Sequence, residues 1–174
     1  MQKSPYRDIL FKTYKNNKNE QNKMQDFKII SLRKQPEKLD IFCNYFRKHR
    51  KKTECYRNLM QFSLESASPL PQWYLLCRHE EICGCCGLIA GDFEECRDLS
   101  PRLCALYVEE KYRGSGLGGK LIEYTANDAS ENGFQNLYCC TDLAGYWEKY
   151  NFSRILTGYY PWGEDFYIYC RSLS

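Results

Sequence analysis

The sequence predicts a single α+β domain in which strands and helices follow one another along the chain. The first reason is size, since 174 residues, of which 43% are hydrophobic and 27% charged, fit one compact domain. The second is a change in hydrophobic period, from strand-like segments such as 73–78 to the helical spacing that starts at Leu117. The third is a glycine-rich turn at 113–119, where a strand runs into that helix.

The first half of the chain, from residue 24, shows closely spaced elements. Pro36 suits the first position of a helix. A short polar turn joins two strand-like segments after residue 72, which predicts an antiparallel hairpin. The mostly apolar segment 102–108 is expected to be a central, buried strand. The predicted elements are a strand at 24–33, helices at 36–50 and about 54–65, and strands at 73–78, 81–90 and 102–108.

The second half begins with a helix from Leu117 that ends near Gly133, a residue suited to a left-handed helix cap. A short helix at 144–150 is expected to end at Asn151, which also tolerates that conformation. No internal repeat or second domain is recognisable, so the domain is expected to span residues 24–174. The remaining predicted strands lie at 134–141, 152–156 and 165–170.

Residues 1–23 are predicted to form a flexible, basic tail. They carry six Lys or Arg side chains against Asp8 and Glu20 and few apolar residues. The formal net charge of the whole chain is only +3, so the excess basicity belongs to this tail. A nucleic-acid-binding domain would carry its Lys and Arg on a folded face. We therefore expect no nucleic-acid partner.

No apolar stretch approaches the roughly 20 residues that span a bilayer, and the first residues lack a signal core. We therefore expect a cytoplasmic protein with no membrane partner. The odd count of 11 cysteines opposes a disulfide scaffold. The Cys-rich run at 83–86 with His79 lacks the repeated paired spacing of a structural zinc site. Most cysteines are expected to be small buried hydrophobes, and no metal is expected.

The turn from Arg113 to Gly119 is the stretch that carries chemistry. Glycine lets the backbone approach an anion closely, and the N–H groups at a helix start favour phosphate. The turn lacks both the P-loop pattern and the acidic ribose partner of a dinucleotide fingerprint. Four glycines within six residues still indicate a pyrophosphate site. A tight turn without any ligand is the alternative.

These residues resemble a known family. Arg-x-x-Gly-x-Gly at 113–118, after a strand that ends Leu-Tyr-Val, resembles motif A of the GNAT acetyltransferases, and 145–152 resembles their Tyr-Glu-Lys-x-Gly-Phe signature. The likeness covers residues 24–171, and 101–108 and 158–164 look like a bacterial, small-molecule-type subgroup. The resemblance implies the GNAT fold, a mixed twisted central sheet of about six to seven strands flanked by helices.

The resemblance also implies an acyl-CoA-dependent N-acetyltransferase that moves an acetyl group from acetyl-CoA to a primary amine in a ternary complex. Amides of 113–118 would bind the pyrophosphate, with Arg113 as a brace. The central strand would splay from its neighbour, whose residues 138–141 form the other lip, and an amide near Leu106 would polarise the thioester carbonyl. The implied cofactor-binding residues are Leu106, Tyr107, Val108, Arg113, Gly114, Ser115, Gly116, Leu117, Gly118, Gly119 and Lys120.

The proton-transfer residues depart from the family pattern. Trp147 stands where the family commonly has a Tyr that acts as the general acid, and an indole N–H does not release a proton. Tyr146 and Tyr150 are the substitutes, and core packing is the alternative role for both. Arg102 stands where some members carry a Glu as the general base.

Acidic side chains in the loop after residue 91 provide the remaining candidates. Asp92 is the candidate base, acting through water. The carboxylates would also attract a cationic small-molecule amine. An ordinary solvated loop is the alternative. The candidate acceptor-binding residues are Asp92, Glu94 and Asp98, with Glu95 beside them.

Several alternatives are compatible with the sequence. Trp147 and Arg102 also suit a non-catalytic acyl-CoA-binding or regulatory module, and the acceptor could be a protein N-terminus or lysine. The aromatic loop at 159–164 could wall the acceptor site or mediate dimerisation, so both monomer and homodimer are possible. His49 and His79 are expected to be surface residues.

Overall fold

The structure is a computed structural model that describes residues 26–49, 53–91, 99–159 and 165–173. The predicted tail, the acidic loop 92–98 and most of the aromatic loop lie outside these residues, so those predictions stay predictions.

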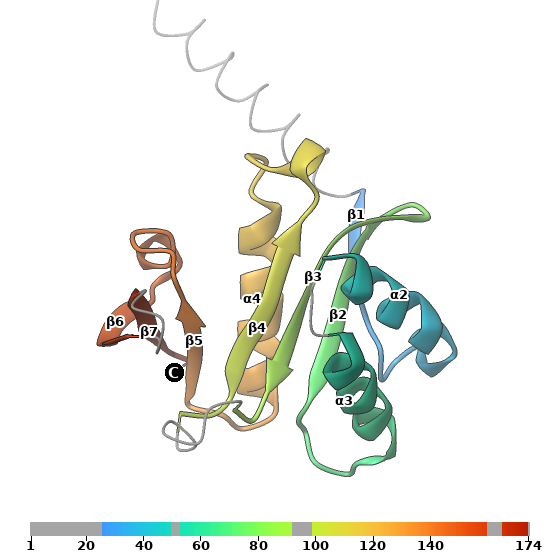
Figure 1. Cartoon of the computed structure of the whole chain (residues 1–174), viewed down its shortest axis with the longest axis horizontal. Helices are drawn as coiled ribbons and strands as arrows, with labels where there is room; N and C mark the ends of the chain where they lie inside the picture. Colours follow the sequence, from blue (N-terminus) through green and yellow to red (C-terminus); the bar gives the residue numbers. More distant parts are fainter. Residues whose placement is uncertain (1–25, 50–52, 92–98, 160–164, 174) are drawn as a thin grey trace, which may run out of the picture.

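A single seven-stranded sheet forms the centre of the described chain, in the order β1-β2-β3-β4-β5-β7-β6 (Figure 1). Neighbouring strands are antiparallel except for β4 and β5, which are parallel. The predicted mixed sheet and the predicted hairpin of β2 and β3 are therefore confirmed. The strands are β1 (Phe27–Ser31), β2 (Gln72–Arg78), β3 (Glu81–Ile89), β4 (Arg102–Val108), β5 (Asn136–Thr141), β6 (Ser153–Tyr159) and β7 (Asp165–Ser172).

Helices cover both faces of the sheet (Figure 1). Helices α2 (Leu39–His49) and α3 (Thr53–Glu65) lie on one face, and α4 (Leu117–Glu131) lies on the other. Pro36 occupies the first position of a 3-10 turn (Pro36–Lys38) that leads into α2, as its fixed φ favours.

Two hydrophobic cores result, one under each helical layer. β2 contributes to both because alternate side chains of a strand point to opposite faces. Trp73 packs with Phe46 of α2, whereas Tyr74 packs on the α4 side, where its hydroxyl donates to Asp128 over 2.6 Å. Both rings are fully buried. The strands nearest the centre are thus held from both sides.

The predicted short helix at 144–150 is wrong. Only a 3-10 turn (Glu148–Tyr150) forms there. Gly145 lies in the left-handed region with φ 77°, which a continuous right-handed helix does not allow. Asn151 does adopt the predicted left-handed conformation, with φ 62°, and ends the turn.

The prediction that residues 102–108 are buried throughout is also wrong. Only Arg102 and Leu103 at the start of β4 are buried, and the other five residues are half-buried. The position is central, as predicted, since β4 is the fourth of seven strands. The reason for the exposure is that its neighbour β5 leaves it after two residues.

Candidate active site

A wedge between β4 and β5 forms a cavity in the described chain. The two strands pair only at Arg102–Tyr138 and Leu103–Cys139 and then separate. The gap between the two ribbons widens toward the start of α4 (Figure 1). A cavity of about 920 Å³ lies there, lined by β4, the glycine-rich turn, the end of β5 and residues 141–150. Its volume is typical of sites for small molecules and cofactors.

A β-bulge shapes the β4 wall of this cavity. Tyr107 pairs with Cys85 and Cys104 pairs with Gly87, so two residues of β4 lie opposite the single residue Cys86. Ala105 has φ 52°, a left-handed conformation that costs a non-glycine residue of order 1–3 kcal/mol. A bulge re-aims the backbone groups around it. The amide near Leu106, implied to polarise a thioester carbonyl, therefore lies beside an irregular, strained backbone.

The glycine-rich turn ends on the N-terminus of α4. Gly114 and Gly116 have φ 77° and 79°, and a Cβ at either position would meet no atom within 4 Å. Gly116 is the N-cap, and Lys120 N–H is the first to bond back to it, over 3.1 Å. The preceding N–H groups of the helix therefore have no intrahelical acceptor. These N–H groups lie at the positive end of the helix dipole. Both features favour the binding of an anion there.

Side-chain contacts hold the turn in place. Arg113 Nε donates to the Val108 carbonyl over 2.9 Å, and its guanidinium lies 5.5 Å from the Tyr107 ring centroid. Tyr112 donates to Glu81 in the β2–β3 hairpin over 2.7 Å, and Ser115 donates back to the Tyr112 carbonyl. The turn is thus attached to β3 and β4 before it reaches the helix.

The cavity takes in most of the residues that the resemblance implied for the cofactor. The predicted residues that line it are Leu106, Tyr107, Val108, Arg113, Gly114, Gly116, Leu117 and Gly118. Ser115, Gly119 and Lys120 are not among its lining residues. The Lys120 ammonium donates to the Phe27 carbonyl of β1 over 2.7 Å, and burial lowers the pKa of this lysine. The Lys120 side chain therefore points to the sheet edge and not to the turn.

Tyr146 and Tyr150 pack against the start of α4. A Cβ at Gly118 would lie 2.5 Å from Tyr146 Oη, and one at Gly119 would lie 2.6 Å from the Tyr150 ring. These glycines are therefore needed for the close approach. Both tyrosines line the cavity, and burial together with a hydrogen bond to Tyr150 raises the pKa of Tyr146. Tyr146 thus stays protonated at neutral pH and able to donate.

Trp147 and Arg102, the two departures from the family pattern, have structural roles. Trp147 is buried, packs edge-to-face on Phe152 at 5.3 Å, and its indole N–H has no hydrogen-bond partner within the described ranges. Buried Arg102 donates to the Leu99 carbonyl over 3.1 Å, and its guanidinium lies against Gly91. Arg102 thereby holds together the two ends of the acidic loop.

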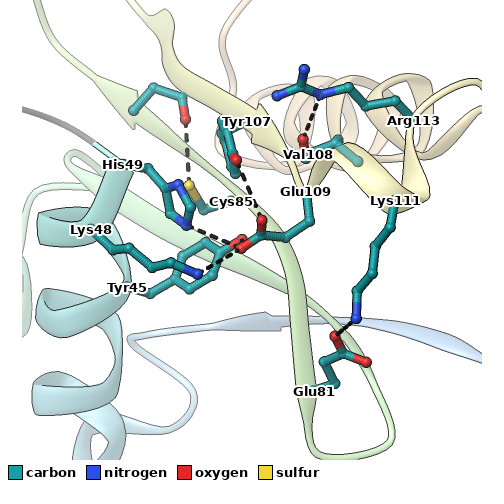
Figure 2. Close-up of polar contacts among 11 residues, drawn as sticks. Tyr45, Lys48, His49, Glu81, Cys85, Tyr107, Val108, Glu109, Lys111 and Arg113 are labelled. Atoms are coloured by element: carbon teal, nitrogen blue, oxygen red, sulfur yellow. Dashed lines mark hydrogen bonds and ion pairs between the residues drawn. The ribbon is translucent and has the colours of Figure 1, made fainter.

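A cluster around Glu109, which follows β4, is the feature that the sequence did not reveal (Figure 2). Tyr45 and Tyr107 donate to its carboxylate over 3.1 and 3.3 Å. Lys48 and His49 place nitrogens 3.5 and 3.1 Å from it. Tyr45 and His49 lie four residues apart on α2, and Tyr107 and Glu109 lie two apart, so each pair shares a face. These spacings could have indicated two polar faces, but nothing in either segment shows that the face on α2 meets the one at the end of β4.

The prediction that His49 is a surface residue is therefore wrong. Its side chain is only 9% exposed, and its ring stacks on Tyr107 with centroids 4.0 Å apart. Its Nε2 lies within ion-pair distance of the Glu109 carboxylate but does not make a directed hydrogen bond within the described residues. Tyr107 also lines the cavity, so this cluster supports the cavity wall from behind. His79 is exposed in the β2–β3 turn, as predicted.

Metal-binding side chains do not gather in groups of three or more among the residues that the structure describes. The nine cysteines with described side chains are all outside disulfides. Within the same residues, no helix has the length and apolar character needed to cross a membrane.

Comparisons with known proteins give one consistent result. Residues 69–154, about half of the chain, match the model of the acetyltransferase (GNAT) domain. No curated protein matches the sequence. The narrower bacterial subgroup stays a prediction.

Solved structures extend the likeness beyond the matched segment. A GNAT-family protein from Desulfovibrio desulfuricans has a TM-score of 0.66 at 14% identity, over 85% of this chain and 99% of that one. A GNAT acetyltransferase from Staphylococcus aureus has a TM-score of 0.53 at 22% identity, over the same shares. One from Elizabethkingia anophelis, solved with acetyl-CoA bound, has a TM-score of 0.50 at 22% identity, over 59% of this chain and 76% of that one. At these identities the likeness shows the fold.

Proposed function

Because this chain belongs to the GNAT acetyltransferase family, we propose that it transfers the acetyl group of acetyl-CoA to a primary amine. The observation that carries the proposal is the wedge between β4 and β5, which opens onto the glycine-rich start of α4. One cavity thereby joins the glycine-rich start of α4 to the part of β4 that lies beyond its two pairs with β5.

The residues of the wedge fit coenzyme A. The N–H groups at the start of α4, reached through Gly116 and Gly118, bind the pyrophosphate, and Arg113 braces the turn. The part of β4 at Leu106 and Val108, beyond its pairs with β5, pairs with the pantetheine arm as another strand would. The amide near Leu106, at the bulge, donates to the thioester carbonyl oxygen and stabilises the charge that develops there.

The proposed reaction is direct attack of an uncharged amine on the thioester in a ternary complex. Tyr146 or Tyr150 donates the proton that the departing thiolate takes up, since both residues line the cavity. Asp92 accepts the amine proton through water, and Asp92, Glu94 and Asp98 attract a cationic acceptor. These acidic roles rest on the sequence alone, because the loop lies outside the described residues.

A thermal-unfolding titration with acetyl-CoA tests the proposal. At about 100 times its dissociation constant, a ligand stabilises the folded state by roughly 2.7 kcal/mol, which raises the midpoint by several degrees. We expect a saturable shift, followed by release of free thiol when a panel of polyamines, aminoglycosides and other amines is added. Without an acceptor, thiol release should be at background level. A folded protein that shows no shift would contradict the proposal.

Replacing one cavity tyrosine by phenylalanine should separate the two acid candidates. We expect Tyr146→Phe or Tyr150→Phe to lower kcat by about 10²-fold while the acetyl-CoA affinity changes little, because only the transferable proton is lost. Steady-state kinetics and the thermal titration give the two quantities. Tyr124→Phe is the matched control, since Tyr124 is on α4 and outside the cavity lining. If both cavity variants kept kcat within twofold, neither tyrosine would be the acid.

A non-catalytic acyl-CoA-binding module is the second candidate. The observation in its favour is Trp147, which is buried in the core where the family commonly has its acid. The same titration discriminates the two functions. Saturable acetyl-CoA binding without thiol release on the whole amine panel would favour the module.

A further inference from the structure

Two cysteines of the cavity lining directly follow the last β4–β5 pair, at the narrow end of the wedge. The last paired residues of β4 and β5 are Leu103 and Cys139. The next residue on β4 is Cys104 and the next on β5 is Cys140, both beyond the end of the pairing. Both cysteines line the cavity, both are half-buried, and both are outside disulfides. The position is where a cofactor arm that enters past the glycine-rich turn and follows β4 would end.

Strand alternation separates these thiols from Cys139. Leu103 and Cys139 pack into the core on the α4 side. Cys104 and Cys140 therefore point toward the opposite face of the sheet, the one that α2 and α3 cover. Cys139 is buried, and desolvation raises the pKa of its thiol, so it is a poor source of thiolate.

The two cavity thiols differ in their surroundings. Cys104 packs against the core under α2 and α3, and its Sγ lies 3.0 Å from the place where a Cβ on Gly87 would be. Cys140 belongs to neither core cluster. Of the two sulfurs, that of Cys140 is therefore the better placed to meet a ligand in the cavity.

We propose that Cys140 is a covalent modification site for coenzyme A, formed by thiol–disulfide exchange with the symmetric disulfide of coenzyme A. The Cys140 thiolate attacks one sulfur, a protein–S–S–CoA bond forms, and the other half leaves as CoA thiolate, so no further oxidant is required. This inference rests on the proposed function, because the glycine-rich turn must hold the nucleotide end.

Binding in the cavity is what makes the exchange selective. Holding one end of the disulfide at the start of α4 makes the reaction at Cys140 effectively intramolecular and raises its local concentration. The mixed disulfide then fills the cavity that acetyl-CoA needs, so transfer stops until a thiol reductant restores Cys140. The site thus ties acetyl transfer to the redox state of the coenzyme pool.

The test uses the full chain with Cys104→Ser, a change that prevents the second thiol from displacing bound coenzyme A. On exposure to CoA disulfide, intact-protein mass spectrometry should show one coenzyme A adduct per chain, which dithiothreitol removes. Cys104→Ser/Cys140→Ser should form this adduct at least 10-fold more slowly. Glutathione disulfide at the same concentration should label at least 10-fold more slowly than CoA disulfide, and excess acetyl-CoA should slow labelling by a similar factor.

Each result is decisive. Equal labelling of the two variants, equal rates with glutathione disulfide, or no protection by acetyl-CoA would overturn the proposal. Ligand-free unfolding midpoints show whether the serine variants fold, and their midpoint shift with acetyl-CoA tests the proposed function separately. A normal midpoint shift with acetyl-CoA, but no coenzyme A adduct, would contradict the Cys140 site and leave the proposed function intact. A folded protein without any midpoint shift in acetyl-CoA would contradict both the proposed function and the Cys140 site.

Discussion

Gly116→Asp should weaken acetyl-CoA binding by at least about 100-fold, measured as the loss of the midpoint shift. Gly116 caps α4 with φ 79°, so the new residue is held in a strained left-handed conformation at a cost of roughly 1–2 kcal/mol. The larger effect is electrostatic, because a carboxylate placed at the helix start competes with the pyrophosphate for the same N–H groups.

Gly133→Asp is the matched control for backbone strain. Gly133 has φ 86°, a Cβ there would meet nothing within 4 Å, and it follows the opposite end of the same helix. We expect a similar loss of stability with acetyl-CoA binding retained. Gly116→Asn, which keeps the shape without the charge, should bind more tightly than Gly116→Asp. If the two Asp variants bound acetyl-CoA equally well, the turn would not be the pyrophosphate site.

Glu109→Gln should lower the free energy of unfolding at pH 7 by about 2 kcal/mol, measured by urea denaturation. The carboxylate accepts hydrogen bonds from Tyr45 and Tyr107 and lies within ion-pair distance of Lys48 and His49. The amide of Gln has one acceptor atom and turns an N–H₂ group toward these donors. Glu110→Gln is the control, since the neighbouring Glu110 is exposed and should cost little.

The same variant has a predicted pH dependence. Burial opposes ionisation of Glu109, but the hydrogen bond from Tyr45 and the charges of His49 and Lys48 outweigh it and lower the pKa below its ordinary value of 4.5. A lowered pKa means that the ionised carboxylate stabilises the fold above the unfolded pKa, and that this stability is lost as pH falls through the folded pKa. The difference between wild type and Glu109→Gln should therefore be full at pH 7 and shrink below about pH 4. A difference that did not vary with pH would contradict the assigned charge interactions.

The order of the strands and helices could be predicted from the sequence because it depends on local physics. Single residues mark several element ends through their preferred φ. They are Pro36 at a helix start, Gly133 after α4 and Asn151 after the last 3-10 turn. Hydrophobic period distinguishes strand from helix within a few residues. The glycine-rich turn was visible for the same reason, since closely spaced glycines before a helix have a local meaning. The prediction of a helix at 144–150 was wrong although the apolar spacing was helical, because Gly145 adopts a left-handed conformation.

The candidate site was decided by the tertiary structure wherever two distant segments meet. The Lys120 side chain reaches the Phe27 carbonyl, and Glu109 meets His49, only because the strand order brings α4 beside β1 and α2 beside the end of β4. Cys104 and Cys140 come to line one cavity only because β4 and β5 pair for two residues and then separate. Sequence by itself determined the elements and the turn that ends on α4, because these need neighbours in the chain. The wedge, the half-buried His49 and the two cavity thiols needed the sheet, because register and strand order are properties of the whole fold.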